Sequence, residues 1–291
     1  MSSLSLALPA RFGVAAFLDF HGRDRHAISE RVEAYVLHKA ATIDGRPCVF
    51  TLDFSQPGQV RATAKSLTRT ALSRHTRAML GLDQPVEAFE KAMAEPTALG
   101  HLVQQQRGLR VPQSATPFEA LSWAIIGQQI SVSAATAIRR RFIQLAGQEV
   151  INGLHCYPDA VAVSQLDSNA LRSVGFSASK AQTLLTVSQR CCDHCLLPDA
   201  LHSNADALNL EHALLGIRGL GPWSVNYTLL RGYGYLDGSL HGDVAVQKAL
   251  QQLLAWNERP AAKATRDWLA EFTPWRALVA AHLWQSLQVQ A

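Results

Sequence analysis

Strict alternation of hydrophobic and polar residues is concentrated in the first part of this 291-residue chain. Three extended runs, separated by an Asp-Gly and a Gln-Pro-Gly sequence, lie between residues 35 and 66. In the middle run, Phe50 and Leu52 fall on one face, and Thr51 and Asp53 fall on the other. This pattern predicts an antiparallel meander with one solvated face.

Helical patterns are predicted on both sides of the meander, around residues 24–33 and 69–105. The strand signals stop at residues 107–117. There Thr116 begins the sequence TPFE, a capping box with proline at the first helical position. The helix that follows is expected to break near Gly127. Further helices are predicted at 165–173, 178–192, 209–217, 222–231, 244–256, 264–272 and 275–288.

These patterns predict an α+β protein with two domains. Residues 1–112 would form an N-terminal α+β domain with an antiparallel sheet. Residues 113–291 would form an all-helical domain, because helices follow one another there through short connections.

Composition narrows the class of protein. Hydrophobic residues make up 48% of the chain and charged residues 17%, which is typical of a globular protein. The net charge of +4 and the pI near 8.9 permit a polyanionic partner without requiring one. No apolar run reaches the roughly 18 residues that span a bilayer. The five cysteines are an odd number, which argues against a disulfide framework. We therefore expect a cytoplasmic protein without a secretory signal or a membrane partner.

The sequence RGLG, which ends just before Pro222, predicts a turn between two helices. Gly219 and Gly221 can take positive φ and leave their amides open to close approach. Two helices joined by such a turn direct unpaired N–H groups at one point, which suits a phosphate. An ordinary helix corner with a glycine C-cap is the structural alternative, and the turn alone does not decide between the two.

An aromatic pair and one carboxylate follow this turn. Trp223 and Tyr227 are four residues apart and share a helix face, so they could belong to the core or line a slot for a flat ring. Asp243 precedes the next helix, where it is either a plain N-cap or an ionised group that acts on a substrate. An anion at that place suits stabilisation of positive charge or activation of water, and does not suit a general acid.

The segment LLGIRGLGPWSVNYTLLRG, followed by HGDVAVQKAL, resembles the helix-hairpin-helix DNA glycosylase superfamily, and within it the 3-methyladenine DNA glycosylase II family. Four further segments are similar to the same family: GLRVPQSATPFEALSWAIIGQQISVSAA, LRSVGFSASKAQTLL, TPWRALVAAHLW and MLGLDQPVEAFEKAM. Together they extend the resemblance from about residue 79 to residue 288. It implies that the all-helical domain is a helix-hairpin-helix glycosylase domain.

The resemblance implies a role for each matching residue. Asp243 matches the catalytic aspartate of the family. The residues that match the aromatic pocket for the flipped base are Trp223, Tyr227 and Trp284. The residues of the hairpin that would bind DNA are Gly219, Leu220, Gly221 and Ser224. Gln128 and Gln129 match the loop of the family that fills the gap left in the duplex by the flipped base, and the side chain of Gln129 would enter the base stack there. The hairpin of the family can also hold a monovalent cation on main-chain carbonyls, here those of Leu215 and Ile217. No metal site made of side chains and no cofactor is implied.

The activity that the resemblance implies is that of a monofunctional DNA glycosylase. It would flip alkylated purines of the 3-methyladenine and 7-methylguanine type out of double-stranded DNA and hydrolyse the N-glycosidic bond, which initiates base excision repair. Electron-rich rings favour such cationic bases, and a cationic base leaves without a general acid. We expect a monomer. Two alternatives remain, a glycosylase of the same fold for deaminated or oxidised bases and a non-catalytic DNA-binding module.

Two departures from the family pattern bear on the chemistry. Bifunctional members carry a nucleophilic lysine where this chain has Trp223, which predicts a hydrolase without lyase activity. Lys248 lies one turn beyond Asp243, where a solvated or phosphate-facing charge is expected. Arg218 replaces a frequent proline of the turn and could contact a phosphate or solvent.

Two clusters invite other interpretations. The sequence CCDHC at residues 191–195 could suggest a metal site, but its tight spacing favours free thiols. The run Arg139–Arg141 is expected to be a solvated helix end, with contact to a DNA phosphate as the alternative.

Overall fold

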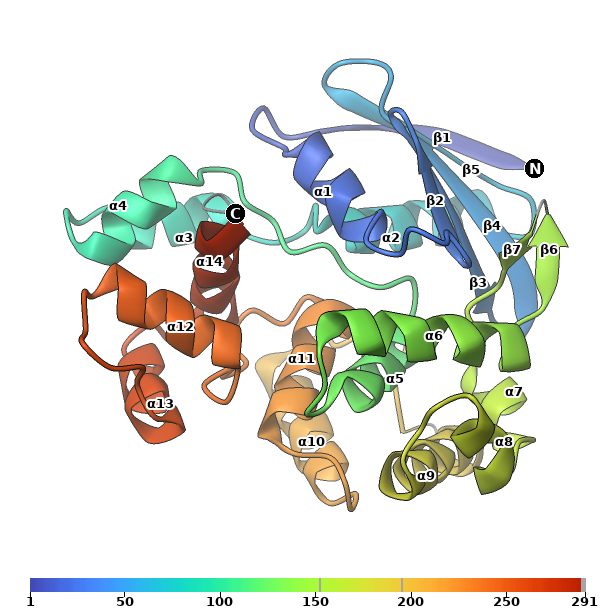
Figure 1. The fold of residues 1–291 in the computed structure, drawn as a ribbon. Coiled ribbons are helices and arrows are strands. Elements are labelled where there is room, and N and C mark those ends of the chain that lie inside the picture. The colour runs from blue at the N-terminus through green and yellow to red at the C-terminus, as the bar shows by residue number, and fades with distance from the viewer. Residues whose placement is uncertain (152, 195, 289–291) are drawn as a thin grey trace.

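The computed structural model describes residues 1–151, 153–194 and 196–288, and its N-terminal part is built on a five-stranded antiparallel sheet (Figure 1). The strand order is β1-β5-β4-β3-β2. The strands are β1 (Ser2–Ala7), β2 (Glu30–Glu33), β3 (Val36–Ile43), β4 (Arg46–Asp53) and β5 (Gln59–Ala64). The predicted meander is confirmed as β3, β4 and β5. Phe50 and Leu52 are fully buried, whereas Thr51 and Asp53 are partly exposed.

The prediction of a helix around residues 24–33 is wrong. Helix α1 spans Val14–His21, and Glu30–Glu33 form the short edge strand β2. A two-residue loop joins β2 to β3, and its first residue, Ala34, has φ +50. Two-residue hairpin loops normally contain glycine or asparagine. This loop contains neither, so the sequence gives no local signal for strand β2. The helices predicted at 69–105 are confirmed as α2 (Arg69–Leu80), α3 (Val86–Ala92) and α4 (Ala98–Gln105).

The remainder of the chain is mostly helical. Thr116 caps α5 through a hydrogen bond of 3.1 Å from the amide of Glu119 to its hydroxyl oxygen, and the predicted break after Gly127 is confirmed. The helices are α5 (Pro117–Gly127), α6 (Val132–Ala146), α7 (Ala160–Ser164), α8 (Ser168–Ser173), α9 (Ala178–His194), α10 (Asn204–Leu215), α11 (Pro222–Tyr233), α12 (Val244–Leu253), α13 (Ala262–Ala270) and α14 (Arg276–Gln288).

The prediction that this part contains helices alone is wrong in one place. Strands β6 (Glu149–Ile151) and β7 (Leu154–His155) form a small hairpin beside the large sheet. They are three and two residues long, too short to show an alternating pattern. The α+β class itself is confirmed, while the domain boundary at residue 112 stays a prediction.

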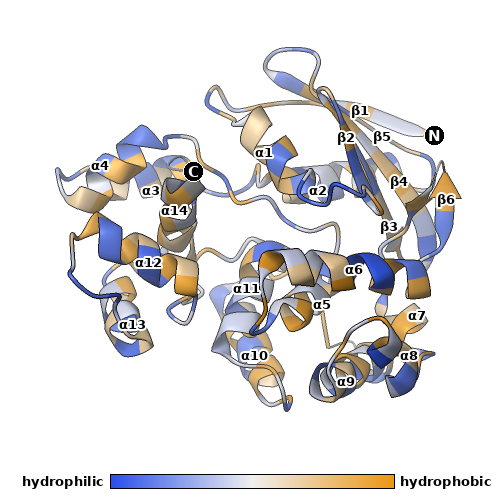
Figure 2. Cartoon of the chain, in the orientation of Figure 1, coloured by the Kyte–Doolittle hydropathy of each residue, from blue (hydrophilic) through white to orange (hydrophobic). Residues whose placement is uncertain are grey.

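Two hydrophobic clusters make up most of the core. One lies between the sheet and helices α5, α6 and α9–α11, and the other joins α3 and α4 to α12 and α14. Figure 2 shows hydrophobic and hydrophilic residues side by side on most helices, as expected of elements that bury one face. Within the described residues, no helix is long and apolar enough to cross a bilayer.

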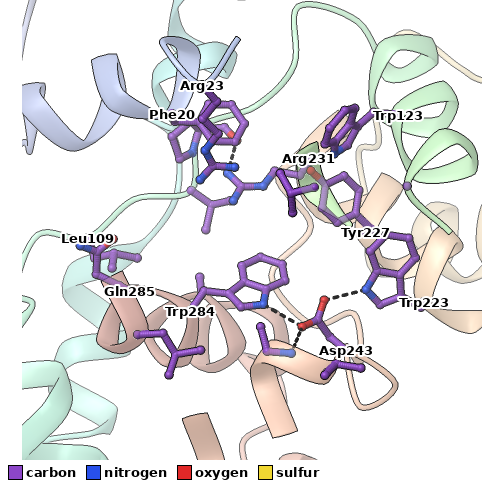
Figure 3. A pocket seen from close by; sticks show the side chains of 18 of the residues that line it. Phe20, Arg23, Leu109, Trp123, Trp223, Tyr227, Arg231, Asp243, Trp284 and Gln285 are labelled. Atoms are coloured by element: carbon purple, nitrogen blue, oxygen red, sulfur yellow. Dashed lines mark hydrogen bonds between the residues drawn. The ribbon is translucent and has the colours of Figure 1, made fainter. Parts of the chain in front are cut away.

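A cleft of about 1590 Å³ opens between the N-terminal part and the helical part of the molecule (Figure 3). Its lining comes from α1, the α5–α6 loop, α11, the start of α12 and α14. The N-terminal part and the helical part therefore both contribute to one cavity.

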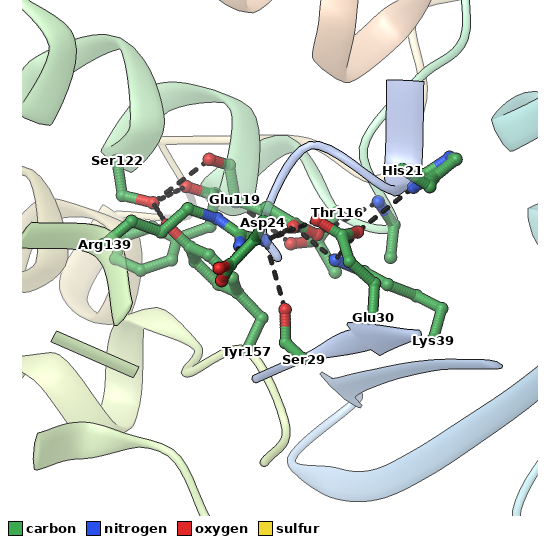
Figure 4. Close-up of polar contacts among 12 residues, drawn as sticks. His21, Asp24, Ser29, Glu30, Lys39, Thr116, Glu119, Ser122, Arg139 and Tyr157 are labelled. Carbon is green, nitrogen blue, oxygen red and sulfur yellow. Dashed lines mark hydrogen bonds and ion pairs between the residues drawn. The ribbon is translucent and has the colours of Figure 1, made fainter. Parts of the chain in front are cut away.

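A buried cluster of charges joins the sheet to the helices (Figure 4). Lys39 of β3 donates hydrogen bonds of 2.9 Å to Glu30 of β2 and 2.5 Å to Glu119 of α5. Arg139 of α6 donates to the same two carboxylates at 3.0 and 3.2 Å. Burial by itself would raise the pKa of Glu30, but Lys39 and Arg139 hold it well below its usual range. Arg139 also pairs with the buried carboxylate of Asp24 at 3.7 Å, so two cations face three carboxylates in this cluster.

This cluster corrects the interpretation of Arg139–Arg141. Arg139 is only 7% exposed and belongs neither to a solvated helix end nor to a phosphate contact. It shares the buried face of α6 with Ala135, Phe142 and Ile143, a spacing visible in the sequence. Arg141 is exposed and donates to the carbonyl oxygen of Val174.

We expect Lys39→Met to lower the free energy of unfolding by about 3–5 kcal/mol, because it leaves buried carboxylates short of a cation. Urea denaturation followed by circular dichroism measures this change. Lys263→Met is the matched control, since Lys263 pairs with Asp267 on the surface of α13, and its loss should cost less than about 0.5 kcal/mol. Equal effects of the two substitutions would contradict a structural role for the cluster.

Candidate active site

Asp243 lies at the N-cap of α12, as predicted. One carboxylate oxygen, Oδ1, accepts hydrogen bonds from the amides of Ala245 at 2.9 Å and Val246 at 3.0 Å. These bonds satisfy two amides that the first turn of a helix leaves unpaired. They also fix the carboxylate at the positive end of the helix dipole.

Two tryptophans bind the same carboxylate from other elements (Figure 3). The indole Nε1 of Trp223, at the start of α11, donates to Oδ2 of Asp243 at 2.7 Å. The indole Nε1 of Trp284, on α14, donates to Oδ1 at 3.1 Å. Asp243 therefore accepts four hydrogen bonds from three helices, and its charge faces the aromatic side of the cleft. The structure brings together the predicted acid and the predicted aromatic residues.

The three predicted aromatic rings form a continuous row. The ring centroids of Trp223 and Tyr227 are 5.4 Å apart, and those of Tyr227 and Trp284 are 6.4 Å apart. Tyr227 also packs in the second hydrophobic cluster, so it is at once a core residue and a residue of the cleft wall. Trp223 and Trp284 are only partly buried, which leaves aromatic surface open toward the cleft.

The two glycines of the hairpin turn differ in backbone conformation and in the space around them. Gly219 has φ +96, and a Cβ atom there would lie 2.0 Å from the hydroxyl oxygen of Thr183. Gly221 is the N-cap of α11 with φ −104, and no atom lies within 4 Å of a Cβ built there. The expected positive φ is therefore present at Gly219 and absent at Gly221. Leu220 between them is buried.

The loop between α5 and α6 is tied to this hairpin. The side-chain amide of Gln128 donates to the carbonyl oxygen of Gly219 at 2.9 Å and to the hydroxyl of Ser224 at 2.8 Å. Lys180 of α9 holds the same loop, because its ammonium donates to the carbonyl oxygens of Ile126 and Gln128 at 2.8 and 2.7 Å. In this structure Gln128 and Ser224 are thus hydrogen-bonded to each other, and their contact with DNA stays a prediction.

Gln129 lies at the exposed tip of this loop. Its φ of +56 is unusual for a residue with a side chain, and such conformations often occur at functional sites. Ile130 beside it is 38% exposed. The loop therefore presents one polar and one apolar side chain to solvent, and the wedging role of Gln129 stays a prediction.

Further features predicted from the sequence are a cation site and the two basic residues Arg218 and Lys248. The carbonyl oxygen of Ile217 accepts a hydrogen bond from the amide of Leu220 inside the turn, and a cation at Leu215 and Ile217 stays a prediction. Arg218 and Lys248 are exposed, and Lys248 is not part of the cleft lining.

The cysteine-rich stretch is only partly described. Cys191 is half-buried and Cys192 is exposed. Cys195 and the side chain of His194 lie outside the described residues. Among the residues that the structure describes, no three His, Cys, Asp or Glu side chains are grouped to hold a metal ion.

Sequence reasoning missed three cleft residues. Arg231 follows Tyr227 by four residues on α11, so its place on the same face was visible in the sequence. Phe20 and Arg23 come from α1 and the residues after it, and no local pattern connects them to a site more than two hundred residues away. Lys180 was also missed, because a single lysine on an amphipathic helix carries no signal of what it contacts.

Comparison with known proteins identifies the family. Residues 122–274 match the family described as HhH-GPD superfamily base excision DNA repair protein. The match covers more than half of the chain, and the chain belongs to this family.

Individual relatives agree with this assignment. The chain is 22% identical to a DNA-3-methyladenine glycosylase of Bacillus subtilis over 97% of its own length and 96% of that protein. It is 27% identical to DNA-3-methyladenine glycosylase 2 of Escherichia coli, over 64% of each chain. The solved structure of 3-methyladenine DNA-glycosylase from Archaeoglobus fulgidus has the same fold, with a TM-score of 0.80, 21% identity and 97% of each chain covered.

The two hairpin glycines should respond differently to alanine. Gly219→Ala should lower the free energy of unfolding by about 2–4 kcal/mol, through its positive φ and the clash with Thr183. Gly221→Ala meets open space and should cost less than about 1 kcal/mol. Thermal and urea denaturation of both variants measure the difference, and similar losses would contradict the conformations described here.

Proposed function

We propose that this protein is a monofunctional DNA glycosylase that removes alkylated purines from double-stranded DNA. One observation carries the proposal. The carboxylate of Asp243 is held by the indole N–H groups of Trp223 and Trp284 and faces a cleft lined by aromatic rings. A flat ring fits against such a wall, and the carboxylate lies where the sugar attached to that ring would be.

The chemistry follows from this arrangement. A nucleotide must leave the base stack before an enzyme can reach its C1′ atom. As the N-glycosidic bond breaks, positive charge develops on the sugar, and the fixed carboxylate of Asp243 stabilises it. Asp243 also orients the water that adds to C1′ and accepts its proton, while the base leaves with the electron pair of the broken bond. A preorganised anion needs no rearrangement during this step, because four hydrogen bonds already hold it.

The surroundings of the cleft suit a DNA partner. Gly221, the N-cap of α11, has no side chain to cap the first amides of this helix beside the cleft, and such amides bind phosphate. The exposed tip at Gln129 lies on the same rim. The net charge of +4 adds a general attraction to a polyanion.

Asp243→Asn should lower the rate of release of free 3-methyladenine from methylated duplex DNA by at least about 100-fold, because it removes the charge and keeps the shape. Chromatography of the released bases measures the rate. Asp167→Asn is the matched control, since Asp167 caps α8 in the same way but lies outside the cleft. It should release the base at the wild-type rate.

The outcomes separate the proposal from its alternatives. Equal release by wild-type and Asp243→Asn protein would reject the role of Asp243. Binding of duplex DNA without release of any base would favour a DNA-binding module. Release of deaminated or oxidised bases alone would favour a glycosylase for those lesions.

The absence of a cleft lysine predicts a second property. The described residues that line the cleft include no lysine, so no amine is placed to form a Schiff base with C1′. Borohydride added during the reaction should therefore trap no covalent complex between protein and DNA on a denaturing gel. A complex that forms in the wild type and is lost in Lys248→Met would contradict this prediction and identify Lys248 as a nucleophile.

A further inference from the structure

The cleft contains a buried cation that the mechanism above leaves unused, the guanidinium of Arg231. This residue is only 7% exposed and follows Tyr227 by one turn of α11. Its Nη1 donates a hydrogen bond of 2.8 Å to the carbonyl oxygen of Pro112. Its Cζ lies 4.4 Å from the ring centroid of Phe20 and 5.6 Å from that of Trp284 (Figure 3).

This cation lacks a carboxylate within the described part of the chain. Its Nε is buried and has no hydrogen-bond acceptor there. Asp243 is the only acid among the described residues that line the cleft, and it is bonded to the two tryptophans and to the amides of its own helix. Burial lowers the pKa of Arg231 to about 10, so the guanidinium keeps its charge at neutral pH. A buried charge without a partner is costly, and this one lies on the wall of a ligand cleft.

Trp284 separates this cation from Asp243. The indole N–H of Trp284 points to Asp243, while its ring lies beneath the guanidinium of Arg231 (Figure 3). A base held against this ring, with its sugar at Asp243, has its far edge on the side of Arg231. The two charges therefore lie at opposite ends of the space for one nucleoside.

The charge at the far edge matters for the leaving group. A purine methylated at N3 or N7 carries positive charge and leaves as a neutral molecule. A neutral oxo-purine leaves with negative charge on its ring and carbonyl oxygen, and needs a proton or a cation there. The described cleft residues include no carboxyl group besides Asp243. A guanidinium on the wall of the cleft can stabilise that charge directly.

We propose that Arg231 determines base specificity by donating a hydrogen bond to the carbonyl edge of a neutral everted oxo-purine, such as hypoxanthine, and by stabilising the negative charge of that base as it leaves. The inference rests on the proposed glycosylase function and deepens it. The same charge repels a cationic methylated purine, so Arg231 shifts the preference of the site from cationic toward neutral damaged bases.

The test compares two bases in one protein. We measure kcat/KM for hypoxanthine and for 3-methyladenine release from duplex DNA, and take their ratio. Arg231→Met should lower this ratio by about 10- to 100-fold, because only the neutral base loses a charged donor. Arg231→Lys retains a charge without the planar donor set and should restore part of the ratio. A ratio of rates from one preparation is independent of the fraction of folded protein.

Leu171→Ala is the control for a purely structural effect, because Leu171 of α8 is fully buried and lies outside the cleft lining. Its two rates should change together, with an unchanged ratio. A ratio in Arg231→Met within about twofold of the wild type would overturn the inference while leaving the glycosylase function standing. A wild-type protein that releases neither base would overturn both.

Discussion

The buried charges between the sheet and helices α5 and α6 are the constraint on which the rest of the structure depends. Lys39 and Glu30 belong to the sheet, Glu119 and Arg139 to the helices, and each carboxylate bonds to both cations. Desolvated charges tolerate little displacement, because every lost hydrogen bond exposes an uncompensated ion to a medium of low polarity. The cluster therefore fixes one orientation of the sheet. That orientation places α1, and with it Phe20, opposite α11 across the cleft.

The carboxylate that we propose as catalytic, that of Asp243, also fixes the positions of several elements. Asp243 caps α12 and also gathers the indoles of Trp223 and Trp284, so one side chain fixes the spacing of three helices. The carboxylate of Asp243 therefore has both a structural role and, in our proposal, a chemical role. A carboxylate whose position is set by four donors meets a developing positive charge without reorganising, which is the main contribution that an electrostatic catalyst makes. The same sharing means that an isosteric change to asparagine can retain the cap through Oδ1 but also leaves the indole N–H of Trp223 without its acceptor.

Local patterns were sufficient for some of these features and insufficient for others. The meander β3–β5 could be predicted because alternation and turn residues are local signals, and Asp243 could be predicted because an N-cap is a local signal too. Strand β2 could not, since it is short and turns at Ala34 without glycine. Arg139 was misinterpreted because a run of arginines suggests solvent, although its spacing to Phe142 places it on the buried face. Trp284 was found through family resemblance alone, and Phe20 through neither, because its place in the cleft depends on how the sheet docks.

The opposite charges at the two ends of the cleft can be considered together. Cleavage of a neutral nucleoside separates charge along the N-glycosidic bond, positive on the sugar and negative on the base. In the proposed mechanism Asp243 lies at the sugar end and Arg231 at the base end, so their combined field favours this separation throughout the step. A cationic base loses positive charge as it leaves, and its repulsion by Arg231 declines along the same path. The guanidinium therefore weakens the binding of a cationic base and does not slow its departure from the bound state. For a neutral base, the same guanidinium acts mainly on the transition state, which is where binding energy accelerates a reaction.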